Sequence, residues 1–199
     1  NMDDPLSSSI GNSLEVETAV EVLLGKNKNE RALLDTTIAL SIELYSMVFA
    51  EKSHVEIKKK IYSLLDSGHV AERFEKMVSA LGGPKHFLST YKKVLPRADS
   101  VVPIKAKQEG YITKINTKAL GDILIKIGGG REKASDKLDL SVGFAEVAKT
   151  GEKVNTKTSL LFLHIADKLL TPSLEGEICD CFSISEREPE KSKDIILQK

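Results

Sequence analysis

The stretch VVPIKAKQEGYITKI, residues 101–115, marks the point where the hydrophobic pattern of the chain changes. Upstream of it, apolar residues recur every three or four positions, as on one face of a helix. Within it, apolar and polar residues alternate, which is typical of strands. We predict strands over Val101–Lys107 and Tyr111–Ile115, joined through Glu109-Gly110. Leu95-Pro96 punctuates the chain just before the change, so the sequence predicts two modules, residues 1–95 and residues 96–199.

The first module is predicted to be an all-helical layer of four helices. Asn12 is expected to be the N-cap of the first helix, with Glu15 as its capping-box partner. The second helix is expected over about Glu30–Phe49, and the third begins at Ser53. The fourth ends at Gly82-Gly83-Pro84, because proline cannot continue a helix and glycine accepts left-handed dihedral angles.

The second module is predicted to be an α+β fold built around antiparallel hairpins. A helix capped by Thr117 is expected to follow the first two strands, because four apolar residues return to helical spacing there. The remaining expected elements are strands at Leu140–Phe144, Gly151–Val154 and Ser159–Ile165, a helix at Leu174–Ser185 and a final strand at Asp194–Gln198.

Composition narrows the class of protein. The 199 residues include 29 Lys and Arg against 29 Asp and Glu, and this zero formal charge argues against a general nucleic-acid binder. The longest nearly uncharged stretch, residues 32–50, is too polar to cross a bilayer. The polar opening, residues 1–13, does not have the pattern of a signal peptide, and two cysteines suggest a reducing compartment. We therefore expect a cytoplasmic protein without nucleic-acid or membrane partners.

The glycine triplet Gly128-Gly129-Gly130, followed by Arg131, is the most suggestive local motif. Consecutive glycine N–H groups can cradle a phosphate, and an arginine can add a bidentate cation. The motif lacks both the Walker ending and the dinucleotide-binding pattern, so a flexible turn is the favoured interpretation. We expect residues 128–136 to be the most mobile internal loop, because glycine loses the most backbone entropy on ordering.

Other candidate residues do not combine into a catalytic or metal site. His54 and His69 lack partners at ligand spacing, and the cations of Lys85–Arg97 are interpreted as a solvated linker face. The paired carboxylates Asp136 and Asp139 and the thiols of Cys179 and Cys181 likewise lack a second class of ligand nearby in sequence. From the residues alone, we predict no catalytic residue and no cofactor-binding residue.

Longer blocks of sequence add a resemblance. They are Pro5-Leu6, Gly11-Asn12-x-Leu14-Glu15-Val16, Arg73-Phe74-x-x-Met77-Val78-x-Ala80-Leu81-Gly82-Gly83-Pro84, Gly110-Tyr111, Thr117-x-Ala119-Leu120-Gly121, Gly128-Gly129-Gly130-Arg131 and Val142-Gly143-Phe144. In this order and spacing they resemble the thymidine/pyrimidine-nucleoside phosphorylase family in its bacterial form. The resemblance covers nearly the whole chain and implies a fold: a helical part of a large α/β domain at 1–95, then the family's C-terminal α+β domain at 96–199, which is expected to be antiparallel and barrel-like, similar to lipoyl or hammerhead domains.

The same resemblance implies a function and a partner. Family members are roughly twice as long, so the chain looks like the C-terminal half of a phosphorylase, and its N-terminal half is the expected partner. The complete enzyme, expected to be a homodimer, would convert thymidine and phosphate to thymine and 2-deoxyribose 1-phosphate. No stretch of this chain matches the family's phosphate-binding or base-binding segments, so the chain alone is expected to be inactive. The loop Gly128–Arg131 is expected to close over the substrate cleft.

The resemblance also implies part of a potassium site in the full-length enzyme. Some family members bind the ion through backbone carbonyls and one glutamate just after the Pro-Leu motif. Leu6 and Ser9 match two of the carbonyl positions, whereas Thr18 stands at the glutamate position, with Glu17 beside it.

An alternative resemblance concerns residues 101–168, which are similar to a barrel of the lipoyl- or biotinyl-carrier type. Asp167-Lys168 mimics the Asp-Lys pair of lipoyl carriers. This alternative implies a barrel-like fold and a carrier or interaction module. A carrier lysine must lie at an exposed hairpin tip, whereas Lys168 is followed by Leu169-Leu170-Thr171-Pro172 rather than by a returning strand.

Overall fold

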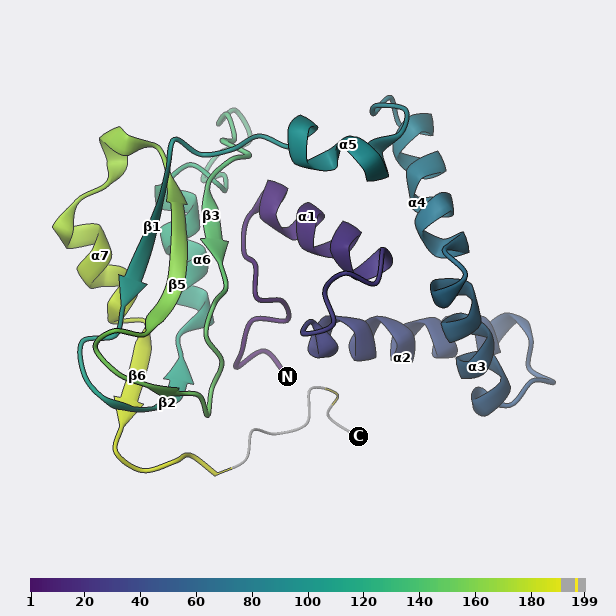
Figure 1. The fold of residues 1–199 in the computed structure, drawn as a ribbon, viewed down its shortest axis with the longest axis horizontal. Coiled ribbons are helices and arrows are strands. Elements are labelled where there is room, and N and C mark those ends of the chain that lie inside the picture. The colour runs from purple at the N-terminus through teal and green to yellow at the C-terminus, as the bar shows by residue number, and fades with distance from the viewer. Residues whose placement is uncertain (191–195, 197–199) are drawn as a thin grey trace. The chain divides into compact units, whose positions relative to one another are not determined.

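The computed structural model describes residues 1–190 and 196, and divides the chain into two compact units (Figure 1). The helical unit comprises residues 16–95. The sheet unit comprises residues 1–15 together with the chain from residue 96 onward. One boundary between the units falls at Leu95-Pro96, and the first 15 residues group with the second half of the chain rather than with the helices. The strand expected at Asp194–Gln198 lies, except for Ile196, outside the described residues.

Five helices account for most of the helical unit. They are α1 (Asn12–Leu23, whose first four residues belong to the sheet unit), α2 (Arg31–Val48), α3 (His54–Asp66), α4 (His69–Ala80) and α5 (Phe87–Val94). The four helices expected from the apolar spacing are confirmed. The fifth, α5, falls in the segment interpreted as a linker: Phe87 and Tyr91, four residues apart, are its buried residues.

Local signals explain where these helices begin and end. Ser53 and Glu56 form a complete capping box at the start of α3, in which each side chain accepts the other residue's backbone N–H. Gly68 and Gly82 adopt φ angles of 78° and 90°, which lie in the region that favours glycine. Within the helical unit, the core cluster is small and consists of Val20, Phe87 and Tyr91, with partly buried apolar residues packed around it.

The sheet unit contains two antiparallel three-stranded sheets. Their strands are β1 (Ser100–Lys105), β2 (Gly110–Ile115), β3 (Gly143–Ala145), β4 (Lys153–Val154), β5 (Ser159–Ile165) and β6 (Phe182–Ser185). One sheet has the order β1-β5-β3, visible side by side in Figure 1, and the other has the order β4-β2-β6. The mixed α+β class is confirmed, but the described strands do not close into a barrel.

The predicted pairing of the first two strands is wrong. β1 pairs with β5, with Ser100 opposite Ile165, and β2 pairs with β6, with Ile115 opposite Phe182. The link Lys105–Gly110 therefore carries the chain from one sheet to the other instead of turning a hairpin. Alternation within a strand indicates which face is buried and carries no information about which strand lies beside it.

The helix expected at Leu174–Ser185 is correct only in its first half. α7 spans Pro172–Cys179, and its N-cap Thr171 accepts the backbone N–H of Leu174. The chain then turns at Asp180-Cys181 and forms β6. The change of element follows from pairing, because β6 completes the sheet of β2. The helix expected from Thr117 is confirmed as α6 (Thr117–Lys126), although its side-chain cap is Asn116, whose Oδ1 accepts the Ala119 N–H.

One large aliphatic core fills the sheet unit. It draws twenty buried residues, among those described, from both sheets, both helices and the loops between them. Phe144, Leu161, Leu163 and Ile165 are fully inaccessible. Within the described residues, no helix combines the length and the apolar content that a bilayer crossing requires.

The N-terminal segment belongs to this unit because it pairs with β3 and the segment after it. Ile10 and Phe144 exchange both backbone hydrogen bonds, at 2.8 and 2.7 Å, and the Val147 N–H donates to the Ser8 carbonyl at 2.9 Å. Two glycines make this close approach possible. A Cβ on Gly143 would lie 2.3 Å from the Ile10 carbonyl oxygen, and one on Gly11 would lie 2.6 Å from the Val142 carbonyl oxygen.

Candidate functional site

The glycine triplet forms the C-terminal cap of α6. The Gly128 N–H donates to the Ile125 carbonyl and the Gly129 N–H to the Leu124 carbonyl, both at 2.9 Å, and Gly128 has a φ of 97°. This pair of bonds is the Schellman arrangement. Two of the N–H groups that could cradle a phosphate are therefore already used. The helix end beside them carries partial negative charge, which disfavours an anion.

The loop after the triplet, residues 131–138, is mostly exposed and internally braced. Arg131 extends from the surface, and the Asp136 carboxylate accepts the backbone N–H groups of Glu132 and Lys133 at 3.1 and 2.8 Å. Asp139, which was weighed as half of a carboxylate pair, accepts the N–H of Ser141 at 2.9 Å within a turn. The two carboxylates thus stabilise separate turns, and the cleft-closing role of Gly128–Arg131 stays a prediction.

Both stems of this loop are joined to the start of α1. The Asn12 side-chain amide donates to the Gly129 carbonyl at 3.1 Å, and the Ser13 N–H donates to the Leu140 carbonyl at 3.2 Å. The stems are also joined to each other, because the Asp139 N–H donates to the Gly128 carbonyl at 2.9 Å. Sequence reasoning did not find this arrangement, since hydrogen bonds between residues 117 positions apart leave no local signal.

The predicted cap of α1 is therefore corrected. Glu15 does accept a backbone N–H at the helix start, but the donor is Gly11, at 2.9 Å. The Asn12 side chain points to Gly129 instead of closing the capping box. The spacing of Asn12 and Glu15 correctly located the helix start but assigned the capped N–H to the wrong residue.

The three positions that the resemblance relates to potassium are Leu6, Ser9 and Thr18. Leu6 is exposed, Ser9 is half-buried, and Thr18 is buried within α1. Backbone carbonyls and a threonine hydroxyl are neutral oxygen donors, and no carboxylate stands at position 18. Across the described chain, His, Cys, Asp and Glu do not gather in threes at a spacing that could hold a metal ion. These residues therefore lack the anionic ligand of such a site, and no chemical step is assigned to it.

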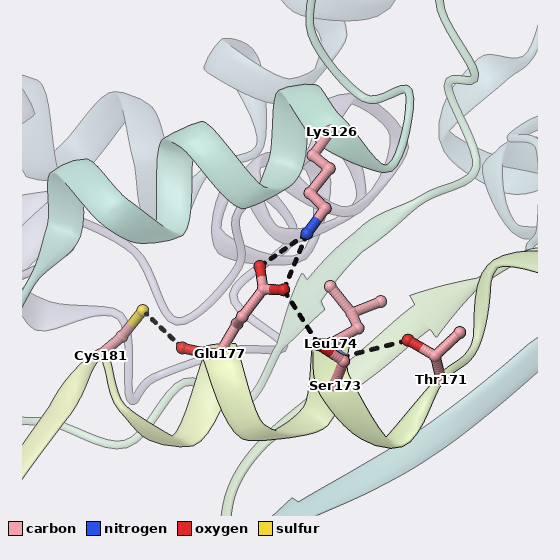
Figure 2. Close-up of polar contacts among 6 residues, drawn as sticks. All are labelled: Lys126, Thr171, Ser173, Leu174, Glu177 and Cys181. Atoms are coloured by element: carbon pink, nitrogen blue, oxygen red, sulfur yellow. Dashed lines mark hydrogen bonds and ion pairs between the residues drawn. The ribbon is translucent and has the colours of Figure 1, made fainter.

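A second polar cluster links α6 to α7 (Figure 2). Lys126 Nζ lies 2.8 and 2.7 Å from the two Glu177 carboxylate oxygens, and Ser173 Oγ donates to the same carboxylate at 3.4 Å. All three side chains are solvent-accessible, and Ser173 lies in the first turn of α7, just after its N-cap Thr171. The cluster links α6 to α7. An exposed ion pair of this kind contributes up to about 1 kcal/mol to the free energy of unfolding.

The two cysteines are not activated thiols. Cys179 donates to the Lys105 carbonyl at 3.5 Å, and Cys181 to the Glu177 carbonyl at 3.3 Å. Burial raises the pKa of the Cys179 thiol, and raises that of Cys181 to about 11. A raised thiol pKa lowers the thiolate fraction at neutral pH, which is the opposite of what a catalytic cysteine needs.

The remaining candidates are exposed residues, each with its own local surroundings. His54 and His69 are exposed, and His69 Nδ1 lies 2.7 Å from Ser67 Oγ. Lys92, one of the cations interpreted as a solvated linker face, lies 3.3 Å from the Glu21 carboxylate. Lys168 occupies a 3-10 turn, Asp167–Leu169, between β5 and α7. It is therefore not at the tip of a hairpin, where a carrier lysine would lie.

The helical unit holds an apolar cavity of about 400 Å³ among α1, α2, α3 and α4. Its walls include Leu23, Leu34, Ile38, Leu65 and Phe74. The hydroxyls of Thr37 and Ser41, which also line it, donate to the carbonyls of their own helix at 2.7 Å. Specific ligand sites combine apolar walls with a few convergent polar groups. The Thr37 and Ser41 hydroxyls therefore offer little to orient a ligand.

Comparison with known proteins bears on the second half of the chain. Residues 111–185 match the sequence model of the family described as the Pyrimidine nucleoside phosphorylase C-terminal domain. The matched region begins in β2, includes α6, the glycine triplet and α7, and ends with the last residue of β6.

Proposed function

We propose that the chain is the C-terminal portion of a thymidine phosphorylase and is inactive without the remainder of that enzyme. The observation that carries this proposal is the family match over residues 111–185, since it spans most of the sheet unit. The order of the quoted sequence blocks, from Gly11-Asn12 to Val142-Gly143-Phe144, supports extending the same assignment to residues outside the match.

The proposed reaction is phosphorolysis of thymidine. A phosphate oxygen forms a bond to C1′ of the deoxyribose, and the bond from C1′ to N1 of thymine breaks. The bonding electrons leave with the base, which takes up a proton, and 2-deoxyribose 1-phosphate remains. The transition state resembles an oxocarbenium ion, so catalysis needs an anion held near C1′ and donors around the departing base.

The geometry of this chain fits a supporting role in that reaction. The glycine N–H groups of residues 128 and 129 cap α6. The proposed contribution is the sheet unit itself and the exposed loop 131–138 at the edge of the cleft, whereas the phosphate and base contacts come from the other portion of the enzyme.

The helical unit supplies a second argument for a missing portion. Leu40, Leu44, Met47 and Val48 recur along one side of α2 and are all more than 60% exposed, while Ile38 is the buried residue of that helix. A helix that is apolar on several faces is normally buried in a larger protein. We propose that the N-terminal half of the phosphorylase covers this apolar α2 face, and that the completed enzyme is a homodimer.

The test is direct. The purified chain, incubated with thymidine and phosphate, is expected to release no thymine above background. Addition of a separately expressed N-terminal half of a bacterial thymidine phosphorylase is expected to produce turnover. A double variant, Leu40→Lys with Leu44→Lys, serves as the matched control, because it should fold but fail to associate. Turnover by the chain alone, abolished by a substitution within it, would overturn the proposal.

A further inference from the structure

The loop 131–138 leaves and re-enters the sheet unit beside the first turn of α1. Asn12 and Ser13 are consecutive, and each contacts a different stem: Asn12 binds the Gly129 carbonyl and Ser13 the Leu140 carbonyl. The bond between Asp139 and Gly128 closes the gap between the stems. Both ends of the loop are therefore hydrogen-bonded to the consecutive residues Asn12 and Ser13.

The Asn12 bond is not part of the capping of α1. Glu15 already accepts the Gly11 N–H, and Gly11 is held against Val142 by the close approach of the two backbones. The amide of Asn12 thus has no role in starting its own helix, and its Nδ2 donates to a carbonyl 117 residues away. The Asn12 side chain therefore links the start of α1 to the segment that follows α6.

We propose that Asn12 is a positioning residue for the loop 131–138, holding the Gly129 stem so that the loop moves about a fixed base. That this loop closes over a nucleoside and phosphate rests on the function proposed above. The clamp, by which we mean the hydrogen bond from the Asn12 side chain to the Gly129 carbonyl, does not depend on that function. The side-chain donor is essential, because the Gly129 group it contacts is a carbonyl that can only accept.

The chemistry of the asparagine suggests a discriminating substitution. Asn12→Asp keeps the size of the side chain and places a negative charge in the first turn of α1, which favours the helix. It also replaces the donor amide with a carboxylate, which repels the Gly129 carbonyl. A role in helix initiation would therefore be preserved by this change, and a role in clamping the loop would be lost.

The experiment is amide hydrogen exchange on the full chain, comparing Asn12→Asp and Asn12→Ala with the unmodified protein. Asn155→Ala is the control, because Asn155 is also exposed and makes one comparable side-chain bond, to the Lys157 N–H at 2.8 Å. In both Asn12 variants, the amides of residues 128–130 and 139–141 are expected to exchange about fivefold faster, the factor for one hydrogen bond of about 1 kcal/mol. Those of β2 and β6 should not change.

Unchanged stem exchange in both variants would overturn the proposal, as would an equal increase throughout the sheet unit, which indicates general destabilisation. A change in Asn12→Ala alone would assign the residue to the helix instead. In the complemented enzyme, Asn12→Asp is further expected to lower kcat/KM about fivefold with association of the halves unchanged. Because exchange needs no turnover, failed complementation would refute the proposed function and leave the clamp measurable.

Discussion

The two units of the chain bury their apolar residues to very different extents. The sheet unit encloses a cluster of twenty buried residues, whereas the cluster of the helical unit contains three, counting only the described chain. The helical unit nevertheless has regular helices, a complete capping box and well-placed terminal glycines. The comparison teaches that local signals are enough to define helices, and that a stable core requires facing surfaces as well. In the sheet unit, the apolar surfaces of the sheets and helices pack against each other. In the helical unit, the apolar surface of α2 around Leu40 and Leu44 is exposed.

The largest expected effect that tests this comparison is Phe144→Ala. Phe144 is fully inaccessible and pairs with Ile10, so the substitution leaves a cavity in the centre of the sheet unit. We expect a loss of about 3–5 kcal/mol in the free energy of unfolding, measured by urea denaturation. Phe144→Leu is the control and should cost less. A loss below about 1 kcal/mol would mean that the sheet unit is no better packed than the helices.

Gly143→Ala addresses the contact between the N-terminal segment and β3. The added Cβ would lie 2.3 Å from a backbone oxygen that cannot move without breaking the Ile10 pair. We expect a loss of about 2–4 kcal/mol, comparable with overpacking combined with backbone strain. Gly151→Ala is the matched control, because Gly151 has a φ of 90° but no atom within 4 Å of its added Cβ. Equal losses for the two variants would mean that the close approach of Gly143 to Ile10 does not cause the destabilisation.

The pH dependence of stability should reveal the burial of Cys181. Its pKa is about 11 in the folded chain, above the value of an exposed thiol, which is about 8.5. The folded state therefore favours the protonated thiol, and this contribution is fully present below about pH 8.5 and lost as pH rises toward 11. The free energy of unfolding should be measured at pH 8 and at pH 10.5. Its decrease between these two pH values should be larger for the unmodified chain than for Cys181→Val. An identical fall in both would exclude the thiol as a source of the dependence.

The smallest expected effect concerns the apolar α2 face. Leu44 is 66% exposed, so Leu44→Gln should change the free energy of unfolding by no more than about 0.5 kcal/mol. Ile57→Ala, in the same unit but at a buried position, should cost about 2–5 kcal/mol. Both values follow from urea denaturation monitored by circular dichroism. A loss above about 1 kcal/mol for Leu44→Gln would show that this face is already covered in the isolated chain.

Sequence reasoning succeeded where the determining contacts are local. The apolar spacing of α2, the box of Ser53 and Glu56, and the stop at Gly82 each lie within a few residues of the element they define. α5 was missed because its two lysines, with Lys85 and Arg97 on either side, were interpreted as a solvated linker face. Its apolar residues do recur at helical spacing, so the periodic signal was present and was set aside in favour of the charged residues and the Leu95-Pro96 that follows.

Sequence reasoning failed where the contacts are distant. The alternation in β1 and β2 indicated strands but did not reveal that their partners are β5 and β6. The role of Asn12 was hidden for the same reason, because a local interpretation as a helix cap was available and physically sound. The grouping of residues 1–15 with the second half of the chain likewise depends on pairs such as Ile10 and Phe144.

The distant pairing of the N-terminal segment has a consequence for the order of events during synthesis. Asn12 leaves the ribosome 117 residues before Gly129, the residue it binds. At typical rates of translation this interval is roughly 6 to 23 s, during which the whole helical unit and the strands β1 and β2 are made, while β3, β4, β5 and β6 have yet to be synthesised. Nascent chains of this protein thus expose an unpaired N-terminal segment for seconds, and the sheet unit folds only after its last strand has emerged.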